Sequence, residues 1–200
     1  EKSLFKEINP FGFILFSRNC DNPLQIIDLI NDLRHVVDRP DAPVFIDQEG
    51  GLVHRLQPPH WHLSPAAKIF GAMYEDNKNT AYEAANLTGR LIAGQLSQLG
   101  ITVNCAPVLD VAFSNTTSAI GSRSFGGNPS LIIDLANSFC EGMLSGGVLP
   151  VIKHMPGHGR ATEDSHHKMP IVRATRKELR QVDFVPFQGL ASMPLGMTAH

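Results

Sequence analysis

The segment "VLPVIKHMPGHG", residues 148–159, joins a short apolar run to a polar end. The run over 148–152 predicts a buried strand, and Lys153 and His154 close it before a turn rich in proline and glycine. A lysine at the end of an apolar strand is costly if it is buried without a partner. The pair therefore indicates that this strand end carries a function.

The same alternation extends along the whole chain. Apolar runs predict strands at 11–16, 42–47, 101–110, 148–154 and 195–200, separated by helical patterns at 22–37, 80–100, 129–145 and 175–192. In the first helix, Asn22 is the predicted cap, and the predicted apolar face contains Leu24, Ile27, Ile30 and Leu33. Continuous apolar strands that alternate with helices are typical of a parallel sheet covered by helices.

Polar residues gather at the carboxyl ends of these strands: Asp47, Asp110, Lys153 with His154, and His200. In a (β/α)8 barrel such ends meet at one mouth, where active sites lie. The competing doubly wound sheet is disfavoured because no GxGxxG follows the first strand. We predict an α/β fold, a (β/α)8 TIM barrel that is incomplete over residues 1–200. About five strand–helix units are present, and five strands do not close an eight-stranded barrel, so we expect the chain to be an incomplete stretch of a larger domain.

Composition excludes several classes of protein. Of 200 residues, 42% are hydrophobic and 18% charged, with a formal net charge of −2. This balance argues against a nucleic-acid partner, which selects for a basic excess, and against a disordered chain. No apolar run approaches the roughly 20 residues that span a bilayer, so no membrane partner is expected. Cys20, Cys105 and Cys140 form no CxxC pair, which favours the reducing cytoplasm.

The loop that follows the fourth strand, "KHMPGHGRATEDSHH" (153–167), is open to three interpretations. It is a solvated loop with structural histidines, a metal site, or a catalytic loop. In an extended segment Asp164 and His166, two positions apart, project from the same side. A carboxylate beside an imidazole raises its pKa and fixes its tautomer, which suits a general acid/base.

A metal site in this loop would draw on His154, His158, His166, His167 and Asp164. The loop contains neither HExxH nor HxH spacing, and Lys153 beside the first candidate ligand would repel a cation. We therefore do not expect a metal site in this loop.

The segment "KHMPGHGRATEDSH" (153–166) closely resembles the signature of the glycoside hydrolase family 3 β-N-acetylglucosaminidases, bacterial enzymes of peptidoglycan recycling. Five further segments resemble the family's in the same order: "GFILFSRN" (12–19), "FIDQEGGLVHRL" (45–56), "NCAPVLDV" (104–111), "AIGSRSFG" (119–126) and "MTAH" (197–200). The likeness spans essentially the whole chain. The fold that it implies is a (β/α)8 barrel, in agreement with the pattern of strands and helices. The resemblance also implies that residues 1–200 are a partial catalytic domain, with the first and the C-terminal strands of the barrel outside this chain.

The resemblance also implies roles for individual residues. The implied ligands of the non-reducing sugar are Asp47, Arg55, Arg123, Lys153 and His154. The implied general acid/base is His166, oriented by Asp164. Taken alone, Asp47 is also consistent with a loop-capping carboxylate, and Arg55 and Arg123 with surface salt bridges.

The activity implied is that of a retaining glycosidase that removes terminal β-linked N-acetylglucosamine from muropeptides carrying 1,6-anhydro-N-acetylmuramic acid. The enzyme is expected to be a cytoplasmic monomer without a cofactor. Leu52 stands where the family commonly has arginine, and the nucleophilic aspartate is expected beyond His200. Two alternatives stay open: a metal-dependent barrel hydrolase, and a sugar-binding relative that has lost catalysis.

Overall fold

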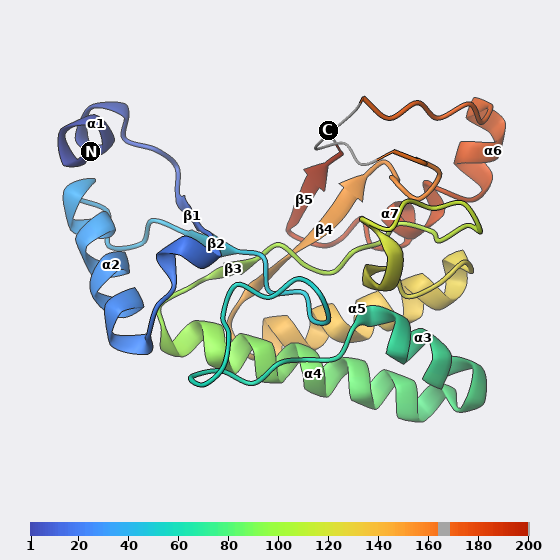
Figure 1. Ribbon diagram of the computed structural model, residues 1–200, viewed down its shortest axis with the longest axis horizontal. Helices are drawn as coiled ribbons and strands as arrows, with labels where there is room; N and C mark the ends of the chain where they lie inside the picture. Colours follow the sequence, from blue (N-terminus) through green and yellow to red (C-terminus); the bar gives the residue numbers. More distant parts are fainter. Residues whose placement is uncertain (164–168, 200) are drawn as a thin grey trace.

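The computed structural model describes residues 1–163 and 169–199. Within them, five strands form one sheet in chain order: β1 (Phe13–Leu15), β2 (Val44–Ile46), β3 (Val103–Asn104), β4 (Leu149–Met155) and β5 (Leu195–Thr198). Every neighbouring pair is parallel, and helices connect the strands (Figure 1). This is the order of a (β/α)8 barrel, of which the described residues form a part, as the sequence predicts.

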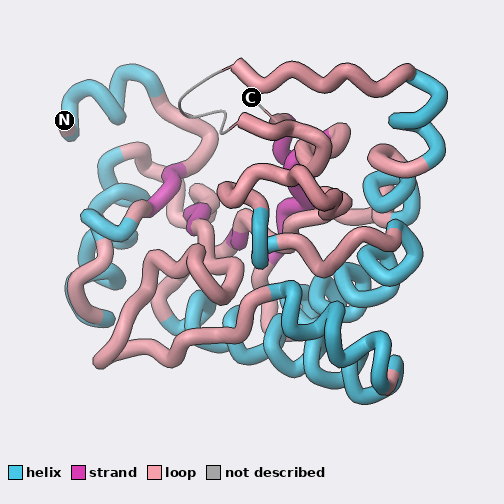
Figure 2. The backbone as a smooth tube through the Cα atoms, turned by 45° about the vertical axis from the view of Figure 1, so that its right-hand side comes forward, coloured by secondary structure: helices cyan, strands magenta, loops and turns pink. Residues whose placement is uncertain are grey.

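Helices surround the sheet. They are α1 (Lys2–Ile8), α2 (Pro23–Val36), α3 (Ala67–Asp76), α4 (Lys78–Gln98), α5 (Pro129–Ser145), α6 (Arg176–Gln181) and α7 (Val185–Gly189), with short 3₁₀ turns η1 (Ser17–Asn19) and η2 (Gly121–Arg123). In both views α3, α4 and α5 lie together below the sheet (Figures 1 and 2). Along the described chain no helix combines the length and the apolar character that a membrane span requires.

Local sequence signals set the helix ends. Asn22, Asn77 and Asn128 each accept a backbone N–H in the first turn of α2, α4 and α5, at 3.0, 3.1 and 2.9 Å. These asparagine caps satisfy amides that have no partner within the helix. Gly100 follows the end of α4 in the left-handed conformation, with φ +82°, which glycine commonly adopts just after a helix.

Three details of the predicted elements are wrong. The predicted strand 101–110 forms a ladder only over β3, with a separate bridge between Val108 and Lys153, because Pro107 lacks the N–H that a continuous ladder needs. The predicted helix 175–192 is two helices, since Pro186 lies in the first turn of α7. Leu24 is 74% exposed, because it lies about 200° around α2 from Ile26, which is buried.

The helix α3 was not predicted. Gly71 lowers the helix propensity of its centre. In the structure a Cβ atom at this position would lie 1.8 Å from the carbonyl oxygen of Phe125. Glycine is therefore required here for close packing.

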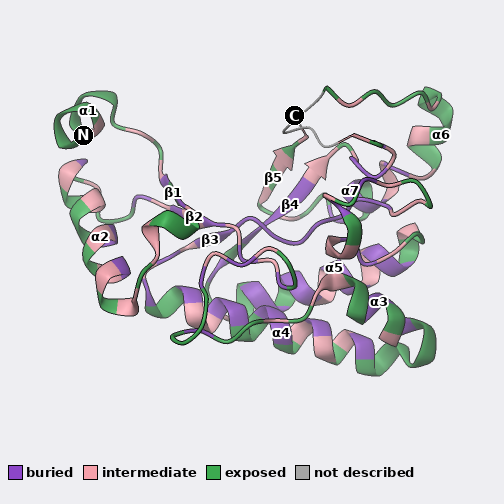
Figure 3. Cartoon of the chain, viewed as in Figure 1, coloured by how far each residue is buried: buried purple, intermediate pink, exposed green. Residues whose placement is uncertain are grey.

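The core lies mainly between the sheet and its helices, where Val44 and Ile46 of β2 join the large cluster of buried apolar residues (Figure 3). The residues that alternate with these along the strands form a second cluster on the other face of the sheet, in which Phe45 packs against Val103 and Val151. Side chains two positions apart in a strand share a face. Asp47 and Lys153, two positions beyond Phe45 and Val151, therefore continue the face turned away from the large cluster.

Candidate active site

A cavity of about 450 Å³ lies at the carboxyl ends of the strands. Its walls come from residues that follow β1 and β2, from the end of β4, from β5 and from the loop that carries η2. The five predicted substrate-binding residues all line it: Asp47, Arg55, Arg123, Lys153 and His154. Their convergence is confirmed, and their role as sugar ligands stays a prediction. The volume lies within the range of small-molecule sites.

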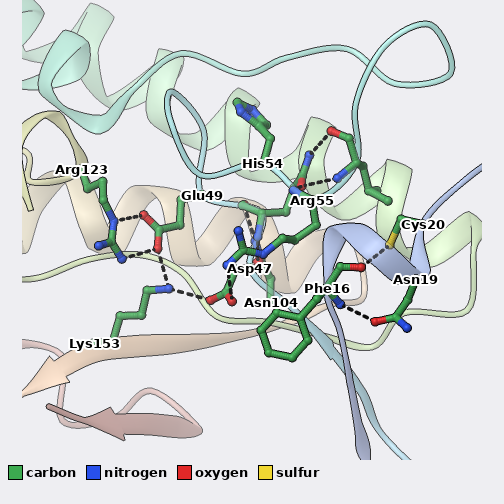
Figure 4. Close-up of polar contacts among 12 residues, drawn as sticks. Phe16, Asn19, Cys20, Asp47, Glu49, His54, Arg55, Asn104, Arg123 and Lys153 are labelled. Atoms are coloured by element: carbon green, nitrogen blue, oxygen red, sulfur yellow. Dashed lines mark hydrogen bonds and ion pairs between the residues drawn. The ribbon is translucent and has the colours of Figure 1, made fainter. Parts of the chain in front are cut away.

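Four of these residues belong to a continuous row of alternating charges (Figure 4). The order is Arg123, Glu49, Lys153, Asp47 and Arg55. Lys153 Nζ stands at the centre, 2.5 Å from Glu49 Oε1 and 3.0 Å from Asp47 Oδ1. At the two ends, Arg55 Nη2 donates to Asp47 at 3.0 Å and Arg123 Nη2 donates to Glu49 at 2.8 Å.

This row explains how a lysine is accommodated at an apolar strand end. The Lys153 side chain is only 2% exposed, and its ammonium has a carboxylate on either side. Burial acts to raise the pKa of Asp47 and of Glu49, but the neighbouring cations outweigh it and hold both pKa values below their ordinary ones. The carboxylates are therefore charged at neutral pH, and the buried cation is compensated.

Asp110 fixes the orientation of the His154 ring. Its carboxylate is fully buried, with Oδ2 2.6 Å from His154 Nδ1, and Oδ1 accepts the backbone N–H of His158 at 2.7 Å. Because the carboxylate accepts, Nδ1 carries the proton of the neutral ring and Nε2 is left as an acceptor. Arg123 Nη2 lies 3.4 Å from this Nε2. Asp110 therefore orients the His154 ring.

The segment between Asp47 and Arg55 is fixed by its own turn. Gln48 Oε1 accepts the backbone N–H of Arg55 at 2.8 Å, which places the start of that side chain. Gly50 has φ +108°, and a Cβ atom there would lie 2.2 Å from the carbonyl oxygen of Pro65. Only glycine fits such a position without strain. The turn is thus specified by sequence and brings Arg55 back over Asp47.

His54 in this turn is a structural histidine. Its Nδ1 donates to the carbonyl oxygen of Gly51 at 3.0 Å, and its Nε2 accepts the backbone N–H of Ser64 at 3.0 Å. Burial lowers the pKa of the ring, which favours the neutral form that these two contacts require. The ring therefore ties the turn to the segment that precedes α3.

Sequence reasoning missed Glu49 and Phe16, which both line the cavity. The available signal for Glu49 was its spacing, two positions after Asp47 and directly before the paired glycines of "QEGG". Phe16 follows β1, and the guanidinium carbons of Arg18 and Arg55 lie 4.7 and 5.8 Å from its ring centre. Leu52, the departure from the family pattern, is 82% exposed and is not among the described residues that line the cavity.

Part of the predicted site lies outside the described residues. This holds for the predicted acid/base His166, its partner Asp164, the candidate ligand His167 and the strand-end residue His200. Within 1–163 and 169–199, no group of three or more histidine, cysteine or acidic side chains is arranged to hold a metal ion.

The chain was compared with known proteins. The family described as "Glycosyl hydrolase family 3 N terminal domain" matches residues 1–200. A β-hexosaminidase of Thioalkalivibrio sulfidiphilus is 37% identical over 202 residues, which cover 100% of this chain and 57% of that protein. A β-hexosaminidase of Pseudomonas aeruginosa is 38% identical over 180 residues, covering 90% of this chain and 52% of that protein.

Solved structures agree with the sequence relatives. NagZ from Neisseria gonorrhoeae in complex with N-trifluoroacetyl-D-glucosamine superposes with a TM-score of 0.93 at 33% identity, covering 100% of this chain and 59% of that one. The chain thus spans somewhat more than half the length of the relatives that it matches.

Proposed function

Because the chain belongs to glycosyl hydrolase family 3 and matches its N-terminal domain, we propose that the protein containing it is a retaining β-N-acetylglucosaminidase. The observation that carries the proposal is the row of alternating charges on the wall of a cavity at the carboxyl ends of parallel strands. The names of the relatives and the sugar ligand of the Neisseria gonorrhoeae protein support it.

In this proposal four members of the row, Arg123, Lys153, Asp47 and Arg55, bind the hydroxyl groups of the terminal sugar. Carboxylates accept from hydroxyls and guanidinium groups donate to them, and such charge-assisted hydrogen bonds are stronger than neutral ones. Arg55 Nε is buried without an acceptor among the described residues, a state that is uncommon outside functional sites. His154 Nε2 offers an acceptor beside Arg123. Donors and acceptors thus alternate along the wall, as the hydroxyls of a sugar require.

The proposed chemistry is a double displacement through a glycosyl-enzyme. An aspartate expected beyond residue 200 attacks the anomeric carbon, while His166 gives its proton to the leaving oxygen. In the second step His166 takes a proton from water, which attacks the same carbon and releases the sugar. Asp164 orients the imidazole and supports its charged form.

The finer assignment concerns substrate and setting. We propose muropeptides with terminal N-acetylglucosamine and 1,6-anhydro-N-acetylmuramic acid as substrates, within peptidoglycan recycling by a cytoplasmic monomer. All three cysteines are described and are free thiols, as the cytoplasm favours.

The test uses the full-length protein and two substrates, N-acetylglucosaminyl-1,6-anhydro-N-acetylmuramic acid and p-nitrophenyl β-N-acetylglucosaminide. The parent should hydrolyse both. His166→Ala should lower turnover of the disaccharide by about 10²–10⁴-fold, because its leaving oxygen needs a proton. Bond cleavage in the activated substrate should suffer much less, so a glycosyl-enzyme should accumulate and appear in the intact mass. Turnover of the disaccharide within a few-fold of the parent would exclude His166 as the acid/base.

Two further arms address the alternatives. The parent should keep its activity in excess chelator, whereas loss of activity that zinc restores would favour a metal-dependent hydrolase. Binding of N-acetylglucosamine without hydrolysis of either substrate would favour a sugar-binding relative.

A further inference from the structure

We infer that Glu49 is a positioning residue of the sugar pocket, which holds the Lys153 ammonium and the Arg123 guanidinium in place for substrate. The inference rests on the proposed function. Glu49 belongs to no role that the family resemblance implied for this chain. Its contacts with these two cations indicate a role in the pocket beyond stabilising the fold.

Glu49 makes three charge-assisted contacts with the two cations. Its Oε2 accepts from Arg123 Nε at 2.8 Å, while its Oε1 accepts from Arg123 Nη2 at 2.8 Å and lies 2.5 Å from Lys153 Nζ. The contact with the guanidinium is therefore a two-pronged fork, which fixes both distance and orientation. One carboxylate thus sets the relative position of both cations.

The three cations of the pocket differ in how firmly the backbone supports them. Lys153 lies on β4, and the backbone of Arg55 is bonded to the Gln48 side chain. Arg123 belongs instead to a short 3₁₀ turn in the long connection between β3 and α5. Apart from Glu49, its guanidinium contacts the Ala119 carbonyl oxygen at 2.8 Å and His154 Nε2 at 3.4 Å. The fork with Glu49 therefore ties a cation on a loop to one on a strand.

The surroundings of Glu49 make it a rigid anchor. Its side chain is only 6% exposed, and its backbone N–H donates to the carbonyl oxygen of Val53 at 2.9 Å within the glycine turn. Glu49 is thus fixed by a backbone hydrogen bond as well as by its salt bridges. A site built on rigid supports keeps its geometry when substrate arrives.

The same contacts argue against Glu49 as a catalytic acid or nucleophile. Both of its oxygens already accept from cationic N–H groups. Burial raises its pKa, but Arg123 and Lys153 more than offset this and lower the pKa below its ordinary value. A carboxylate held charged and fully engaged is a poor proton donor and a poor nucleophile.

The expected effect follows from the fork. In Glu49→Gln the amide retains one acceptor oxygen, and its NH₂ group faces donors, so Arg123 loses its two-pronged partner. Misplacement of a binding group by about 1 Å costs on the order of 10²-fold in rate. We expect kcat/KM for the natural disaccharide to fall by about 10²-fold, mostly through KM, because the contacts are with the bound sugar and not with the reacting bond.

A double-mutant cycle in the full-length protein tests the inference. If Glu49 acts through Arg123, then Glu49→Gln should cost much less in an Arg123→Ala background than in the parent. Arg123→Lys keeps the charge and loses the fork, so it should show the same reduced sensitivity and serves as the second background. Asp134→Asn is the matched control, since it removes a carboxylate that accepts from Tyr74 and Tyr82 on the helices. It should lower the melting temperature and leave KM unchanged.

The outcomes separate the two claims. Additive losses from Glu49→Gln and Arg123→Ala in an otherwise active enzyme would overturn the inference and leave the proposed function standing. A Glu49→Gln variant that melts earlier but keeps the parental KM, as the Asp134 control should, would do the same. A parent without hydrolase activity would overturn the proposed function and the inference with it.

Discussion

Replacing Lys153 by methionine should lower the free energy of unfolding by about 3 kcal/mol at pH 7. Removing one partner of a buried ion pair typically costs about 3–5 kcal/mol, because an uncompensated charge stays behind. The lower end applies here, since Asp47 keeps Arg55 and Glu49 keeps Arg123. Methionine has a similar unbranched shape, so the packing change should add less than about 1.5 kcal/mol.

The loss of unfolding free energy caused by Lys153→Met should become smaller in acid, because the two neighbouring carboxylates become protonated. The pKa values of Asp47 and Glu49 lie below their ordinary values of 3.8 and 4.5, so their ionised forms stabilise the fold above those values and this contribution is lost as pH falls. Without Lys153, one of the cations that lower the two pKa values is gone, so the effect of burial is less offset and both pKa values rise. The variant therefore takes up protons at a higher pH than the parent, which neutralises the carboxylates that have lost a cation, so the cost of the substitution should shrink progressively as pH falls.

The assay is urea unfolding of the full-length parent and variant at several pH values between 7 and 4, followed by circular dichroism. Lys68→Met is the control, since Lys68 is exposed on α3, and it should stay within about 0.5 kcal/mol of the parent throughout. A cost below about 1 kcal/mol at pH 7 would refute the reasoning. So would a cost that is the same at pH 4 as at pH 7.

Three further predictions address other parts of the molecule. Gly50→Ala should lower the free energy of unfolding by about 1–3 kcal/mol, because the φ of Gly50 is +108°. Gly94→Ala, with open space around the added methyl group, should raise it by about 0.5–1 kcal/mol, and equal shifts of the two variants in urea unfolding would contradict this. Asp110→Asn should lower kcat/KM of the full-length enzyme by roughly 10–100-fold, the cost known for losing the carboxylate that orients a metal-bound histidine, and unchanged kinetics would exclude an orienting role. Burial raises the pKa of Cys105 to about 11 and of Cys140 to about 12, so iodoacetamide at pH 8 should label them only after unfolding; mass spectrometry of the labelled native protein would reveal the contrary.

The parts of the fold that sequence predicted well are those with strong local signals. Apolar runs located all five strands of the described sheet, and Asn22, directly before Pro23, marked the start of α2. The convergence of Asp47 and Lys153 was also predictable. Parallel strands place their carboxyl ends at one edge, whatever the length of chain between them.

The parts that sequence could not predict depend on distant partners. Glu49 reaches Arg123 across 74 positions, and His154 reaches Asp110 across 44. No local pattern encodes such pairs. The helix α3 was missed for the same reason, since Gly71 weakens the helical pattern and serves a close contact with Phe125.

The row of alternating charges also restricts how this sequence can change during evolution. Lys153, at its centre, is flanked by two carboxylates, so a neutral residue there takes one cationic partner from each of them at once. Arg55 and Arg123, at the ends, each adjoin one carboxylate of the row. Substitutions should therefore appear among relatives first at the ends, and a loss of charge at Glu49 should coincide with a compensating change at Arg123. Covariation in this pocket should thus follow the order of the row and not the order of the chain.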